Sequence, residues 1–307
     1  MSINEKALQL FEANEYSEAL GLLEQAVKEE RTVQALNNLA WMYLYEEEDA
    51  KRAKPLLEEV IAMHPSSYFP YAMLGEIALQ EKQWASAREL LHTSLAIKHS
   101  REAVHNLAVA DYHTGRLQQA ADGFHSIAED SDISSWYEVS VRIQNGETAV
   151  AKSILDRWND QSDQYLGAIE AADAYAEIGC LREARKMYEK EWKEYVVSSY
   201  VISRYAYVLF HLQDTEACRQ VIDQAIADKA IEMEEERQEP CDEHWSATDK
   251  AERIDELHRE LSGLQQLFDQ LQAGFRPPFE FEMHTEGGCY LFGCKQHGHP
   301  EYVGIGE

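Results

Sequence analysis

The sequence has no long apolar run and few basic residues. No stretch approaches the roughly 20 consecutive apolar residues that a membrane-spanning helix needs, and residues 1–6 carry no apolar segment of a signal peptide. Only 28 lysines and arginines stand against 56 aspartates and glutamates, a formal net charge of −28. Such a field repels phosphate backbones and anionic lipids, so we expect neither a nucleic-acid nor a membrane partner, and a cytoplasmic protein. The acid excess fits the solubility of exposed helix faces or, as the alternative, a basic protein partner.

Catalytic motifs are also missing. The sequence contains no glycine-rich phosphate loop, no nucleophile motif with a partnered base, and no helix-borne histidine pair with a glutamate. Its five cysteines are odd in number and thinly spread, which argues against a secreted disulfide framework. The sequence therefore predicts a protein that is not an enzyme.

What the sequence does contain is a repeat. An alanine recurs at intervals of 34, 34, 33, 31, 33 and 33 residues, at Ala19, Ala53, Ala87, Ala120, Ala151, Ala184 and Ala217. Four positions after each alanine stands an apolar residue: Leu23, Leu57, Leu91, Phe124, Leu155, Tyr188 and Val221. A fixed period near 34 predicts an array of helix pairs, in which the alanine lets two helices approach and the larger residue fills the adjacent space. Five positions before four of the alanines, where the turn needs a positive φ, stand Asn14, Gly115, Gly146 and Gly179.

This pattern resembles the tetratricopeptide repeat family. The small–large–small signature of that family is clearest in the fourth repeat, at Leu107, Ala108, Gly115, Ala120 and Phe124. The resemblance covers about residues 3–230 and implies an all-α, right-handed superhelical solenoid of about seven helix pairs, which we assign to residues 1–230. It also implies that a concave groove binds a peptide or a protein partner, and it implies no reaction.

The register of the repeat predicts which side chains line that groove, because in this family the first helix of each pair forms the concave face. The predicted groove residues are Asn37, Trp41, Phe69, Glu76, His105, Tyr112, His113 and Trp136, with Tyr45 close to the same face. Aromatic, amide and imidazole side chains suit an extended peptide, since they combine a large contact area with neutral hydrogen bonding. The alternative is that Trp41, Tyr112 and Trp136 pack between repeats.

Two further asparagines match a motif of one subset of the family, which grips a partner's terminal carboxylate. Asn38 and Asn106 fall on the asparagine rung of that motif, but Met73 stands between them and the companion lysines are missing. We therefore do not expect the C-termini of chaperones as ligands.

The period ends after Ala217. Residues 231–246 are rich in glutamate and predict an acidic connector, and residues 247–273 predict one more helix with apolar residues at alternating spacings of three and four. We expect this helix to cap the open end of the solenoid. Pairing with a second chain is the alternative, so the oligomeric state stays open.

Residues 274–307 form a tail of different character. Pro277 and Pro278 exclude a helix, residues 279–283 alternate with period two, and Gly287-Gly288 offers a turn before a second apolar stretch. The pattern predicts a small β-hairpin.

The tail also holds the candidate metal ligands Cys289, Cys294, His297 and His299. Two thiolates and two imidazoles suit tetrahedral zinc, and four protein ligands would make the site structural. Other residues could replace one of these ligands, namely Cys241, His244 and His284. The alternative is a pair of buried or redox-labile thiols.

The function predicted from these features is a scaffold or adaptor that binds a protein or peptide partner, with a tail pinned by structural zinc. The alternative is a metal- or redox-responsive regulator, or a metal-dependent enzyme, that uses the tail.

Overall fold

The computed structural model describes residues 2–158, 167–191, 198–242 and 245–302 of the 307-residue chain. Within these residues the protein is all-helical, with no strand assigned. The chain divides into two compact units, which we describe separately: unit 1 comprises residues 1–145 with 282–307, and unit 2 comprises residues 146–281.

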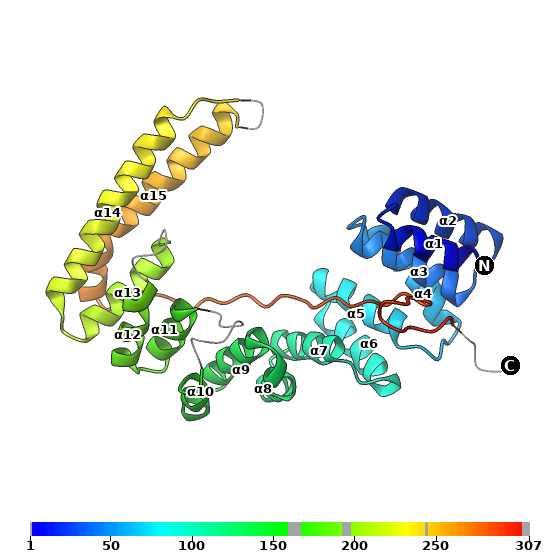
Figure 1. Cartoon of the computed structure of the whole chain (residues 1–307). Helices are drawn as coiled ribbons and strands as arrows, with labels where there is room; N and C mark the ends of the chain where they lie inside the picture. The colour runs from blue at the N-terminus through cyan, green and yellow to red at the C-terminus, as the bar shows by residue number, and fades with distance from the viewer. Residues whose placement is uncertain (1, 159–166, 192–197, 243–244, 303–307) are drawn as a thin grey trace. The chain divides into compact units, whose positions relative to one another are not determined.

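Unit 1 is built from successive helix pairs followed by one more helix (Figure 1). The pairs are α1 (Ile3–Glu12) with α2 (Tyr16–Glu29), α3 (Val33–Tyr45) with α4 (Ala50–Ala62), α5 (Phe69–Gln80) with α6 (Trp84–Ile97), and α7 (Arg101–His113) with α8 (Leu117–Ser126); the short 3-10 helix η1 (Ala128–Asp130) and α9 (Asp132–Gln144) follow. Four first helices begin at a hydroxyl side chain that accepts a backbone N–H of the first turn, from Ser2, Thr32, Ser100 and Ser131. Local capping therefore fixes where these groove-forming helices start.

Unit 2 contains α10 (Thr148–Leu155), α11 (Ala168–Glu177), α12 (Leu181–Glu191), α13 (Ser199–His211), α14 (Thr215–Gln238) and α15 (Ala247–Gln272). Helix α14 runs on through residues 231–238 of the glutamate-rich segment. Helix α15 packs along α14 and buries an apolar stripe at Leu257, Leu264, Leu267, Phe268 and Leu271. This stripe is therefore used inside the chain. None of the described helices is both long and apolar enough to cross a membrane.

The alanine ladder forms the contact between helices, as the sequence predicts. Six of its members are fully buried: Ala19, Ala53, Ala87, Ala120, Ala151 and Ala184. In the seventh repeat the buried positions shift by one residue to Cys218 and Ile222. The predicted positive-φ turn is confirmed at Asn14, Gly115, Gly146 and Gly179, and Lys82 and Gln213 adopt it in the turns after α5 and α13. The small residues and turn residues together set the helix-pair fold.

The predicted β-hairpin is wrong. Residues 275–291 have no assigned secondary structure, and the backbone from residue 277 onward is held mainly by side chains of the helices. The period-two alternation does mark an extended segment. It does not reveal that helix side chains, rather than a second strand, satisfy the backbone of that segment.

Candidate peptide groove and metal cluster

Five alternate carbonyl groups of the tail accept hydrogen bonds from side chains of unit 1. The carbonyls belong to His284, Glu286, Gly288, Tyr290 and Phe292. Their donors, in the same order, are His105 Nε2 at 2.9 Å, Asn106 Nδ2 at 2.7 Å, Trp41 Nε1 at 3.1 Å, Asn37 Nδ2 at 2.7 Å and Asn38 Nδ2 at 2.9 Å. The period of two is that of an extended strand. The tail thus lies across α7 and then α3, against the order of the repeats.

Two asparagines bind both backbone groups of one tail residue. Asn106 accepts the N–H of Glu286 at 2.9 Å while donating to its carbonyl, and Asn38 does the same for Phe292, also at 2.9 Å. Both amides are fully buried. Asn4 joins the second pair, since its Nδ2 donates to the Phe292 carbonyl at 3.2 Å and its Oδ1 accepts from Asn38 at 2.7 Å. A side-chain amide here supplies the donor and acceptor that a neighbouring strand would supply in a sheet.

Aromatic side chains of the tail are buried against the helices. Tyr290 is 1% exposed and Phe292 is 4% exposed. The Phe69 ring on α5 lies 5.7 Å from the Tyr290 ring and 4.8 Å from the Phe292 ring. Tyr45 and Tyr68 complete the surround of Tyr290, with centroid distances of 6.5 and 6.1 Å. These distances are typical of favourable aromatic pairs, so the two tail rings anchor the segment.

A buried carboxyl group lies beneath this aromatic cluster. Glu76 is 2% exposed, and the hydroxyl of Tyr45 hydrogen-bonds to it. Burial raises the pKa of Glu76 to about 8, an effect partly offset by the hydroxyls of Tyr45 and Tyr290. The neighbouring carboxylate of Glu102 adds to the rise. At neutral pH the carboxyl is therefore mostly protonated and can itself donate a hydrogen bond.

One charged contact completes the groove. The Glu286 carboxylate lies 2.7 Å from Arg101 Nη1 and 3.3 Å from His105 Nδ1. Burial lowers the pKa of His105, although Glu286 opposes the shift. Nε2 of His105 must carry a proton to donate to the His284 carbonyl, so Nδ1 of the neutral ring is unprotonated. Arg101 is therefore the main cation that pairs with Glu286.

Not all predicted groove residues contact the tail in this way. Asn37, Trp41, Phe69 and His105 do so through the bonds and rings described above, and Glu76 lies beneath Tyr290. Of the remaining three, His113 stacks on Trp84 at 3.9 Å, Tyr112 meets His113 edge to face, and Trp136 is buried in α9.

The tail also brings together three of the four predicted metal ligands. One ligand atom from each of Cys289, Cys294 and His297 lies within 4.8 Å of the others, with Cys294 Sγ 3.4 Å from His297 Nδ1. His299 is outside this group, and its Nδ1 lies 3.2 Å from the carbonyl oxygen of Leu291. Burial raises the pKa of the Cys289 thiol to about 11 in the absence of a cation. Two thiols and an imidazole at this separation fit three positions of a tetrahedral zinc site.

The alternative ligand His284 does not join this group. Cys241 is exposed, His284 contributes its backbone to the groove, and His244 lies outside the described residues.

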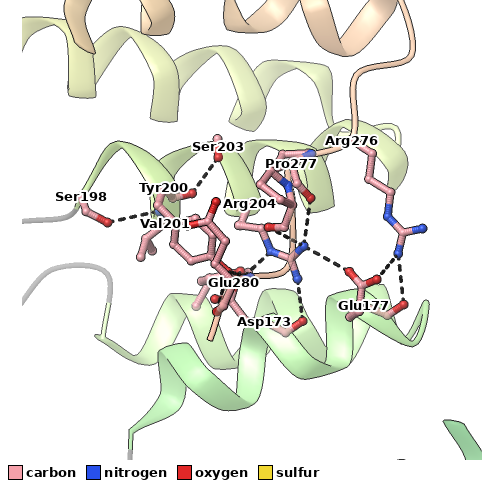
Figure 2. A network of polar contacts seen from close by, with 12 residues as sticks. Asp173, Glu177, Ser198, Tyr200, Val201, Ser203, Arg204, Arg276, Pro277 and Glu280 are labelled. Atoms are coloured by element: carbon pink, nitrogen blue, oxygen red, sulfur yellow. Dashed lines mark hydrogen bonds and ion pairs between the residues drawn. The ribbon is translucent and has the colours of Figure 1, made fainter. Parts of the chain in front are cut away.

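Unit 2 holds the beginning of the tail with a different set of groups (Figure 2). Arg204 on α13 is 1% exposed and donates to the carbonyls of Pro277 at 3.1 Å and Pro278 at 3.3 Å. The same guanidinium bonds Asp173 on α11, at 3.2 Å to Oδ1 and 2.8 Å to the backbone carbonyl. The hydroxyl of Tyr200 accepts the N–H of Glu280 at 3.1 Å. A buried charged network therefore anchors residues 277–280.

The sequence prediction of the groove missed several side chains that hold the tail. In unit 1 they are Asn4, Asn38, Arg101, Asn106 and Tyr137, the last of which accepts the His284 N–H at 3.0 Å. A signal was present for three of them, because Asn4, Asn38 and Asn106 are separated by 34 and 68 residues, one and two repeat lengths.

The fold and this groove define a helical-repeat protein whose first helices hold an extended segment. Residues 44–108 match the family model of the tetratricopeptide repeat. The chain is thus similar to the tetratricopeptide repeat over these residues, and its other helix pairs continue the same alanine ladder.

Comparison with solved structures returns other helical proteins at low identity. A structure of Naa15/Naa10 bound to HypK-THB has 14% identity and a TM-score of 0.43, over 89% of this chain and 41% of that chain. The hetero-tetramer Cut9-Hcn1 of the APC/C has 11% identity and a TM-score of 0.44, over 85% and 53%. The P58(IPK) TPR domain has 15% identity and a TM-score of 0.30, over 87% and 98%. The chain thus spans about half or less of the first two matched chains. No curated protein matches the sequence.

Proposed function

We propose that the chain is a non-catalytic interaction scaffold whose unit 1 groove binds an extended segment of a protein partner. The observation that supports this function is the row of five alternate tail carbonyls, each bonded to a groove side chain. Backbone groups are common to all peptides, so the same donors can hold a segment from another protein. In this view the tail is an intramolecular occupant of the partner's site.

Covalent attachment gives the tail an advantage over any external peptide. A tethered segment has an effective concentration that reaches the millimolar range for short flexible links, so a free peptide must bind tightly or find the tail weakened. The test therefore needs a full-length chain whose own tail docks poorly.

The double variant Tyr290→Ala/Phe292→Ala removes both aromatic anchors from the tail and leaves the helices unchanged. A fluorescent peptide with the natural sequence of residues 282–302 should bind this protein saturably, measured by anisotropy under reducing conditions. Adding Asn106→Ala should weaken binding about tenfold, because two buried hydrogen bonds are lost. Gln25→Ala, which removes an exposed amide on α2, is the matched control and should have no effect. Absence of saturable binding to the double variant would reject the groove function.

We also propose that a structural zinc ion pins the tail through Cys289, Cys294 and His297. The proposal rests on the grouping of their ligand atoms within 4.8 Å. His299 is the candidate for the fourth position: its Nδ1 faces the Leu291 carbonyl and so carries a proton, which leaves Nε2 as the ring nitrogen that can bind a metal. Such an ion would join the residue before Tyr290 to the turn after Phe292 and so hold both anchors in place.

Metal analysis of the purified protein tests this site. We expect about one zinc per chain in the wild type, and its loss in Cys289→Ser/Cys294→Ser with the helical circular dichroism retained. Cys180→Ser is the control, because that thiol lies in unit 2 and should not alter the metal content. A wild-type protein without any transition metal would reject the proposal.

A further inference from the structure

We infer that the groove selects a defined class of partner peptide: an acidic residue followed by two glycines, one variable residue, an aromatic residue, another variable residue and a second aromatic residue. In the tail this pattern is Glu286-Gly287-Gly288-Cys289-Tyr290-Leu291-Phe292. The inference rests on the proposed peptide-binding function and adds the chemistry of the partner.

The acidic position is set by Arg101. Its Nη1 lies 2.7 Å from the Glu286 carboxylate, and its Nη2 is held 3.3 Å from the hydroxyl of Ser134. Arg101 and Glu286 side chains are 34% and 24% exposed, so the pair is partly shielded from water. A basic residue at this position would bring a second cation beside Arg101, and the ring of His105 lies on the same side.

The first glycine is required by the closeness of Tyr45. A Cβ atom on Gly287 would lie 2.8 Å from Cε1 of the Tyr45 ring. That ring cannot easily yield, because its hydroxyl bonds to buried Glu76 and its face lies 5.2 Å from the Trp41 ring. Any side chain at this position would therefore displace Tyr45 from its contact with Tyr290.

The second glycine lets the tyrosine ring fold back beneath the backbone. A Cβ atom on Gly288 would lie 2.9 Å from Cζ of Tyr290 in the same segment. The carbonyl of Gly288 also accepts the indole N–H of Trp41 at 3.1 Å, which fixes the backbone at this point. The close approach of the Tyr290 ring thus favours glycine at this position.

The two aromatic positions fill the centre of the groove. The ring of Tyr290 is enclosed by the rings of Tyr45, Tyr68 and Phe69. The ring of Phe292 packs on the ring of Phe69, and the side chain of Asn38 accepts the backbone N–H of Phe292. Asn106 on α7 and Asn38 on α3 belong to helices that both contact α5, so their separation is set by the fold. The two asparagines therefore fix the six-residue spacing between the acidic position and the last aromatic one.

A peptide panel tests this specificity on the full-length Tyr290→Ala/Phe292→Ala protein. Relative to the natural 282–302 peptide, we expect the Kd to rise more than tenfold for Gly287→Val and for Tyr290→Ala, and about tenfold for Glu286→Lys. The control is His284→Ala, because the side chain of His284 is exposed and only its backbone is bonded. Its Kd should stay within about twofold of the natural peptide.

A charge exchange provides a second, independent readout. Arg101→Glu introduced into the same protein should weaken the natural peptide and restore much of the binding of the Glu286→Lys peptide. If all panel peptides bind with equal Kd, or if the exchange fails to restore binding, the specificity inference is overturned while the backbone-binding function stands. If no peptide binds at all, both fail.

Discussion

Units 1 and 2 each hold part of one tail by its carbonyl groups, but with opposite chemistry. Unit 1 uses neutral donors, with amides at Asn37, Asn38 and Asn106 flanked by an indole and an imidazole. Unit 2 uses the guanidinium of Arg204, which is nearly fully buried and paired with Asp173. The same task, satisfying an extended backbone, is thus met once without charge and once with it.

The difference predicts different sensitivities. Removal of a neutral amide leaves no unpaired charge behind. The free energy lost should therefore be that of the hydrogen bonds alone. A buried ion pair is costly to break, because removal of one partner leaves the other charged and desolvated. Unit 2 should therefore respond more strongly to a single change than unit 1.

The largest effect is expected from Arg204→Met. Loss of the guanidinium leaves the carboxyl of Asp173, whose pKa is already raised by burial, without its cation. We expect unit 2 to be destabilised by about 3–5 kcal/mol, measured by denaturant dependence of hydrogen exchange in α11 and α13.

Two companion variants sharpen this result. Asp173→Asn in the Arg204→Met background should recover part of the stability, because it removes the unpaired charge. Arg276→Met breaks a pair with Glu177 whose arginine is 53% exposed, and should cost less than about 1 kcal/mol. Equal losses for Arg204→Met and Arg276→Met would contradict the assignment of a buried charged network.

The next largest effect is expected from Asn38→Ala in unit 1. This change removes the bonds to both backbone groups of Phe292 and the bond to Asn4. We expect a cost of about 2–3 kcal/mol in tail docking, seen as faster hydrogen exchange at the Phe292 amide. Gln25→Ala, which removes an exposed amide on α2, is the matched control. An equally small effect of both variants would show that the bonds of Asn38 do not hold the tail.

A pH-dependent effect should arise from Glu76, the buried carboxyl beneath Tyr290. Between its ordinary pKa of 4.5 and its raised pKa of about 8, Glu76 holds a proton in the folded chain that the unfolded chain has released. Its contribution to the free energy of unfolding therefore falls as pH rises through this window, by at most about 1.4 kcal/mol per pH unit. Glu76→Gln should remove this slope. The difference between wild type and variant, followed by denaturant titration from pH 5 to 9, would be constant if Glu76 were ionised in the fold.

The smallest effect is expected from Glu286→Gln. This change breaks the partly exposed pair with Arg101 and should weaken tail docking by less than about 1 kcal/mol, and by less again when salt is raised. The Asn38→Ala effect should not change with salt. A strong salt dependence of both would show that unit 1 also relies on charge.

Much of the fold was predictable because its signals are local and repeated. Ala120 needs space at a helix crossing and Gly115 needs a positive φ, and both requirements recur with the same period. The slip at Cys218 marks where that regularity weakens.

The groove was only partly predictable. Register identifies which face Asn37, Trp41 and His105 share, because register follows from helix periodicity. It cannot identify what covers that face, since the tail is about 180 to 250 residues away in sequence and its contacts are side chain to backbone. Asn38 and Asn106 lack the companion cations that a carboxylate ligand needs, whereas a peptide backbone needs only their amides.

The carbonyl contacts recur at every second residue, so they fix the register of the tail on the helices. Deleting one residue between Glu286 and Phe292 would turn every subsequent carbonyl away from its donor, whichever residue is removed. A substitution at a solvent-facing position such as His284 leaves the register unchanged. The length of this segment is therefore as tightly constrained as its sequence.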